Sequence, residues 1–76
     1  MPIVHREGPF RVGIWPHDHD PPHVHVYNSD GMCIVEIETG RIRTTVRMQV
    51  RDATRAVSIV AEQRGSLLAA WRKIHG

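Results

Sequence analysis

The feature that most constrains the fold is a change of hydrophobic period near residue 49. Up to Met48, apolar and polar residues alternate, and turn-forming clusters interrupt them at REGP, PHDHDPP, NSDG and ETGR. This pattern is typical of half-buried strands joined by short turns. From about Val50, apolar residues recur at the spacing of one helical face: Ala53, Ala56, Val57, Val60, Leu67, Leu68, Trp71 and Ile74. The sequence therefore predicts an α+β fold, an antiparallel β-meander with a C-terminal helix packed on one face.

The predicted elements divide the chain into a meander of four or five strands and a helical region. The expected strands are Ile3 to Arg6, Phe10 to Trp15, His23 to Tyr27, Met32 to Glu38, and Arg41 to Met48. Gly65 and Ser66 are placed to break the helical region, 50–75, into a helix pair. At 76 residues the chain is expected to be one domain, 1–76, with the meander in 1–48. So small a core favours support from a bound metal or a homodimer.

Turn lengths predict the register, because opposed residues on paired strands point to the same face. The expected pairs are Glu36 with Arg43, His23 with Glu36, His25 with Ile34, His25 with Gly13, and His23 with Trp15. The first pair follows from a two-residue turn at Thr39 and Gly40. The predicted core face consists of Phe10, Val12, Ile14, Val24, Val26, Cys33, Val35, Ile37, Ile42, Val46 and Met48. The helix would cover this face, and both strand histidines would lie on the other.

The stretch HDHDPPHVHV contains four of the chain's six histidines. Two histidines at i and i+2 on a strand project to the same side, so both can bind one metal ion. Imidazole and carboxylate groups together suit zinc, nickel or iron(II). The residues predicted to bind a divalent transition metal are Asp18, His19, His23 and His25.

Two other interpretations of the histidine stretch stay open. His23 and His25, with Glu36 and Arg43, would supply the acid, base and anion clamp of a small metal-free RNase-like hydrolase. Alternatively, the stretch is a turn with exposed histidines that has a structural role or binds a partner. The sequence alone does not decide whether the protein is an enzyme.

Charge is distributed unevenly along the chain, although the formal net charge is only +2. Two arginines accompany six acidic residues before residue 41, whereas seven arginines and one lysine accompany two acidic residues from residue 41 onward. Because guanidinium groups bind phosphate, a basic stripe could bind nucleic acid. Its members would be Arg43, Arg47, Arg51 and Arg55. The alternative is a solvated face on which nearby glutamates neutralise the arginines of the last strand.

Cysteine content and hydropathy bear on the cellular compartment. The single cysteine, Cys33, has no partner for an internal disulfide. The sequence has no apolar run of membrane length and no apolar leader segment. We therefore expect a cytoplasmic protein without a membrane partner.

Three motifs connect the chain to a known family: MPIV at the start, PPHVHV in the middle and LLAAW near the end. They resemble a small bacterial family catalogued as domain of unknown function 4160, whose signature is PPHxH after an acid and a histidine. The likeness covers essentially the whole chain and applies to Asp18, His19, Pro21, Pro22, His23, His25 and Trp71. His17 departs from the family pattern. Because the family is often encoded beside another small protein, the resemblance implies a protein partner and a toxin–antitoxin-type pair.

Overall fold

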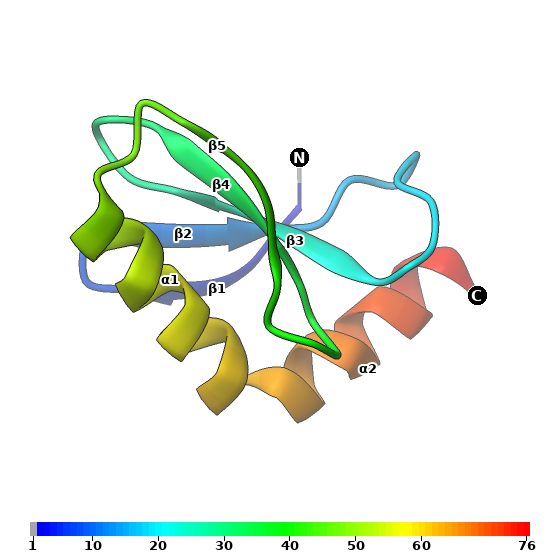
Figure 1. Ribbon diagram of the computed structural model, residues 1–76. Coiled ribbons are helices and arrows are strands. Elements are labelled where there is room, and N and C mark those ends of the chain that lie inside the picture. Colours follow the sequence, from blue (N-terminus) through cyan, green and yellow to red (C-terminus); the bar gives the residue numbers. More distant parts are fainter. Residues whose placement is uncertain (1) are drawn as a thin grey trace.

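Five strands form one antiparallel sheet in chain order, followed by two helices, in the computed structural model, which describes residues 2–76 (Figure 1). The elements are β1 (Ile3–Glu7), β2 (Phe10–Gly13), β3 (His23–Tyr27), β4 (Met32–Glu36), β5 (Ile42–Val46), α1 (Val50–Glu62) and α2 (Arg64–His75). The predicted α+β meander is confirmed. Met1, the first residue of the MPIV motif and of the predicted meander, lies outside the described residues.

The core lies between one face of the sheet and the two helices, which Figure 1 shows on the same side of the strands. Alternation in β3 explains how the sheet supplies it, since Val24 and Val26 are completely buried. The buried core residues are Phe10, Val12, Ile14, Val24, Val26, Cys33, Val35 and Ile37 from the strands and loops, with Ala56, Ile59, Val60, Leu67 and Trp71 from the helices. Most of the predicted core face is therefore correct.

The register around β3 is also largely as predicted. The observed pairs include His23 with Glu36, His25 with Ile34, and Gly13 with His25. The expected pairing of His23 with Trp15 is wrong, because β2 ends at Gly13. Trp15 instead begins the loop before β3, where its backbone N–H donates to the Asp18 carboxylate at 3.0 Å.

The predicted pairing of β4 with β5 is wrong. The expected two-residue turn is a four-residue loop, residues 37–40, in which the Glu36 N–H donates to the Arg41 carbonyl at 2.9 Å. The strand leaves the ladder early because Ile37 is buried in the core and its N–H donates to the Pro22 carbonyl at 3.0 Å. A register shift beside Val35 follows, so Glu36 is not paired with Arg43 in the ladder.

Two residues of the predicted core face, Val46 and Ile42, are exposed instead, and the register shift explains the first. Val46 pairs with Met32 rather than with Cys33, which turns it to the face away from the helices, and it is 47% exposed. Ile42 lies on the edge strand and is 38% exposed. Met48 is partly buried against the core, as predicted.

The helical region divides into two helices at Gln63, two residues before the predicted break, and Gly65 lies within α2. The second helix corrects another expectation, that both strand histidines lie away from the helices. The buried Trp71 on α2 brings its ring centroid within 5.3 Å of that of His23. Among residues 2–76, no helix is long and apolar enough to cross a bilayer.

Candidate metal site

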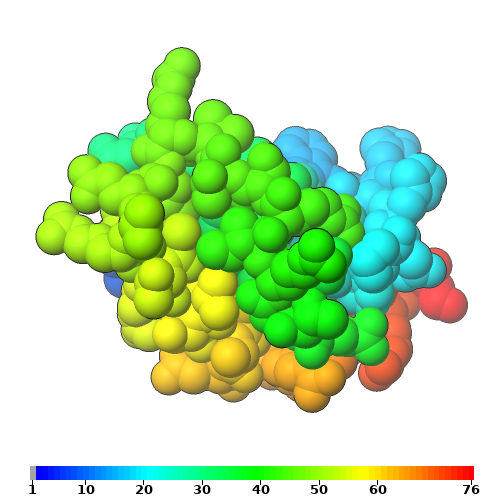
Figure 2. Space-filling view, viewed as in Figure 1, coloured from blue at the N-terminus to red at the C-terminus, as the bar shows by residue number. Residues whose placement is uncertain are grey.

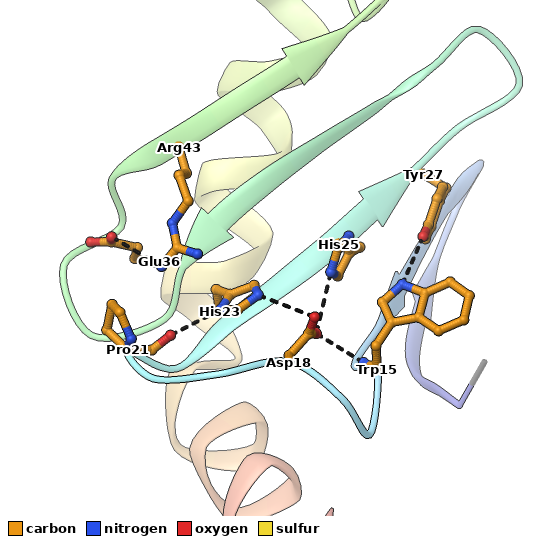
Figure 3. A network of polar contacts seen from close by, with 8 residues as sticks. All are labelled: Trp15, Asp18, Pro21, His23, His25, Tyr27, Glu36 and Arg43. Carbon is orange, nitrogen blue, oxygen red and sulfur yellow. Dashed lines mark hydrogen bonds and ion pairs between the residues drawn. The ribbon is translucent and has the colours of Figure 1, made fainter.

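The loop between β2 and β3 positions the carboxylate of Asp18. The Asp18 N–H donates to the Trp15 carbonyl at 3.1 Å, and the Trp15 N–H donates to Asp18 Oδ2 at 3.0 Å. This reciprocal pair closes a local turn of the kind that aspartate favours. Figure 3 shows the carboxylate directed from this turn toward the two histidines of β3.

Three side chains converge at the start of β3 (Figure 3). Asp18 Oδ1 lies 3.5 Å from His23 Nε2, and Asp18 Oδ2 lies 3.3 Å from His25 Nε2. One ligand atom from each of the three residues can be chosen so that all lie within 4.8 Å of one another. Around a tetrahedral zinc ion with bonds of about 2.0 Å, neighbouring ligand atoms are separated by roughly 3.3 Å. The two histidine–carboxylate contacts, one to each oxygen, approach this separation, and the whole set lies within 4.8 Å.

The hydrogen bond made by His23 Nδ1 determines whether Nε2 of the same ring can bind a metal ion. His23 Nδ1 lies 2.9 Å from the Pro21 carbonyl oxygen, which can only accept a hydrogen bond. Nδ1 therefore carries a proton, and in the neutral ring Nε2 presents a lone pair to the Asp18 carboxylate. Two acceptors that face each other repel unless a proton or a cation lies between them. Metal-ligating histidines typically donate their other N–H to a carbonyl or carboxylate in this manner.

His25 is held mainly by aromatic packing. Its ring stacks on Tyr27 with a centroid separation of 6.3 Å and meets Trp15 edge-on at 6.2 Å. Burial lowers the pKa of His25 below 6.5, outweighing the carboxylate of Asp18, and the neighbouring His23 and Arg43 lower it further. His25 is therefore neutral at pH 7, the form in which imidazole binds a metal ion.

Helix α2 supports the site from the side of His23. Trp71 contacts two histidine rings: its centroid is 5.3 Å from that of His23 and 3.8 Å from that of His75. His75 Nδ1 donates to the Trp71 carbonyl at 3.0 Å. Sequence reasoning placed Trp71 in the core and missed its contact with His23, because a periodic pattern does not reveal which strand end a helix reaches.

The predicted metal ligands are only partly brought together. Asp18, His23 and His25 form one group, with side-chain exposures of 16%, 6% and 12%. His19 is exposed on the loop and does not belong to this group, and His17 is also exposed.

The residues predicted for a metal-free hydrolase lie on three neighbouring strands, and Glu36 has partners of its own. The Glu36 carboxylate accepts hydrogen bonds from Thr39 Oγ1 at 3.0 Å and from Arg43 at 3.4 Å. The Thr39 hydrogen bond, followed by the contacts with Arg43, lowers the pKa of Glu36. Both ring nitrogens of His23 face Pro21 and Asp18 instead, and the catalytic role of these residues stays a prediction.

The predicted basic stripe lies on the surface formed by β5 and the start of α1, whose side chains project in Figure 2. The arginines at its two ends, Arg43 and Arg55, form ion pairs with glutamates. Arg43 pairs with Glu36 at 3.4 Å. Arg55 pairs with Glu7 and, at 3.5 Å, with Glu62. Arg47 and Arg51 are exposed between these ion pairs, and nucleic-acid binding stays a prediction.

Comparison of the sequence with known protein families shows which part of the chain, and which residues of the candidate site, match a family. A family model described as a domain of unknown function (DUF4160) matches residues 10–72. The chain belongs to this family. The DUF4160 match extends from the start of β2 into α2, so it includes all three converging side chains and Trp71. Searches of curated proteins and of solved structures found no match.

Proposed function

We propose that this DUF4160 chain binds a divalent transition-metal ion through Asp18, His23 and His25. The convergence of their ligand atoms within 4.8 Å supports the proposal most strongly. The hydrogen bond from His23 Nδ1 to the Pro21 carbonyl adds to it, because it leaves the Nε2 lone pair directed inward. Two imidazoles and one carboxylate suit zinc, iron(II) or nickel.

Three protein ligands leave at least one coordination position open. Structural zinc sites usually have four protein ligands, whereas sites that bind a substrate or ligand keep a position free. The limited exposure of the three side chains still gives access from the loop surface. We therefore assign the chain to metal-dependent binding modules, in which the ion presents an open position to a small ligand or to a partner protein.

The other interpretations have less support. A metal-free hydrolase needs a histidine and Glu36 that both reach one substrate, and the two nitrogens of His23 are engaged by Pro21 and Asp18. A role in a toxin–antitoxin-type pair, a homodimer and a neighbouring protein partner stay predictions.

Calorimetric titration of metal-stripped protein with zinc, nickel and anaerobic iron(II) tests the proposal. We expect one site per chain, and we expect Asp18→Asn and His25→Ala each to weaken binding at least about tenfold, since each removes a ligand or its charge. His17→Ala and His19→Ala are matched controls, because they remove histidines of the same loop outside the group. Binding no tighter than about 1 mM, roughly 4 kcal/mol, would contradict the proposal.

A further inference from the structure

A second concave site lies on the face of the sheet away from the helices. It has a volume of about 480 Å³ and is lined by Ile3, Arg6, Arg11, Trp15 and Tyr27. This volume is within the usual range for small-molecule sites, roughly 300–1,000 Å³. The pocket combines two cationic side chains with two aromatic rings, and none of these four residues belongs to the proposed metal ligands.

The positive charges of the two arginines lie close together and repel each other. Arg6 of β1 and Arg11 of β2 are directly opposite in the register, so their side chains share one face. Like charges in such a pair destabilise a sheet. Within residues 2–76 neither has an acidic partner, in contrast to Arg43 and Arg55. An anion bound between them would offset the repulsion, and guanidinium groups bind phosphate through paired N–H donors.

The aromatic wall of the pocket is held in place. Trp15 Nε1 donates to the Tyr27 hydroxyl at 3.3 Å, and Figure 3 shows the two side chains joined by this bond. Trp15 is 39% exposed, and Tyr27 is directly opposite Arg11 in the register. A flat, partly exposed ring beside a cationic pair suits a ligand that joins an aromatic base to a phosphate.

We propose that this pocket binds a mononucleotide, with its phosphate on Arg6 and Arg11 and its base against Trp15 and Tyr27. The inference goes beyond metal binding and does not require it. The two sites are neighbours, because the Trp15 N–H that donates to Asp18 belongs to a residue that also lines the pocket.

Nuclear magnetic resonance of the ¹⁵N-labelled, metal-free chain tests the inference, with AMP, adenosine and inorganic phosphate as separate probes. AMP is expected to shift the Trp15 indole signal and the amides of Arg6 and Arg11. It should bind at least about tenfold more tightly than phosphate or adenosine alone, because stacking and phosphate contacts then act together. Using metal-free protein keeps this result independent of the metal proposal.

The double variant Arg6→Gln/Arg11→Gln should weaken AMP binding at least about tenfold. Arg64→Gln is the matched control, since Arg64 is exposed on α2 and lines no part of the pocket. Three results would overturn the inference: AMP binding no tighter than phosphate, shifts centred on β5 or α1 instead of the pocket, or equal binding by the double variant and the control.

Discussion

At the scale of single residues, one hydrogen bond determines the chemistry of the Asp18 group. The Pro21 carbonyl accepts a hydrogen bond from His23 Nδ1–H, so Nε2 of the neutral ring has only a lone pair to offer the nearby carboxylate. Burial keeps His25 neutral. A cation between His23 Nε2 and the Asp18 carboxylate, as proposed above, would relieve their repulsion, and the same contacts orient the rings in advance.

The thiol of Cys33 gives a prediction at the same scale. Cys33 is completely buried, and burial raises its pKa from 9.0 to about 11. Because the thiolate is the reactive form, iodoacetamide should modify the native protein much more slowly than the urea-unfolded protein at about pH 8. Mass spectrometry over time measures both rates, and similar rates would contradict the burial of this thiol.

The same shift predicts how stability depends on pH. Since the pKa of Cys33 is raised in the folded state, the folded chain retains a proton that the unfolded chain loses above pH 9.0. Its contribution is therefore complete below pH 9.0 and is lost as the pH rises toward about 11. Urea unfolding at about pH 8 and about pH 10.5 should show a larger fall in stability for the wild type than for Cys33→Ala. Equal falls would contradict this account.

The sequence predicted part of the candidate site because part of it depends on strand alternation. The spacing of His23 and His25 placed both on one side of β3, and the structure agrees. The positions of the loop residues could not be predicted in this way, because a loop has no regular alternation that indicates which way each side chain points. Asp18 turns inward through its hydrogen bonds with Trp15, whereas His19 remains exposed. The family resemblance named both residues and did not distinguish their positions.

At the scale of elements, charge pairing was a poor guide to register. Glu36 and Arg43 form the expected ion pair at 3.4 Å although they are not paired in the ladder. Long side chains span an offset of a residue or two, so their complementarity does not select one register. The burial of Ile37 and its bond to Pro22 determined the loop instead, and these are tertiary contacts.

Two glycines give opposite predictions for their elements. A Cβ atom at Gly31 would lie 2.0 Å from the Val46 backbone oxygen, so Gly31→Ala should force β4 and β5 apart and destabilise the fold by at least about 1 kcal/mol. A Cβ atom at Gly65 of α2 would meet open space. Gly65→Ala should therefore stabilise the protein, by up to about 1 kcal/mol. Urea unfolding measures both, and a neutral Gly31→Ala would contradict the close β4–β5 contact.

At the scale of the whole molecule, a change of period near residue 49 was sufficient to predict a sheet covered by helices. The sheet and both helices contribute to one core, so neither region buries its apolar face alone. A chain of 76 residues buries a modest fraction of its surface, so an additional interaction between its elements would add substantially to its stability. The proposed metal ion would provide one, because it joins the loop at Asp18 to β3.

Metal binding should therefore stabilise the fold. A ligand at about 100 times its dissociation constant contributes roughly 2.7 kcal/mol if it binds only the folded chain. For so small a domain this corresponds to a rise in Tm of about 10 °C or more. Scanning calorimetry with and without zinc measures the rise, with Asp18→Asn as the variant that should lose it and His17→Ala as the variant that should keep it. An equal rise in both variants would indicate binding elsewhere.

The central claim is tested most directly by the ring nitrogens of the histidines. Long-range ¹H–¹⁵N spectra of the labelled chain, recorded during a zinc titration, report protonation and metal binding at each Nδ1 and Nε2. We predict that Nε2 of His23 and of His25 shifts together at one equivalent of zinc, that His23 Nδ1 stays protonated, and that His17 and His19 are unchanged. Shifts at His17 or His19 without shifts at His23 and His25 would contradict the assigned site, and unchanged spectra would contradict metal binding itself.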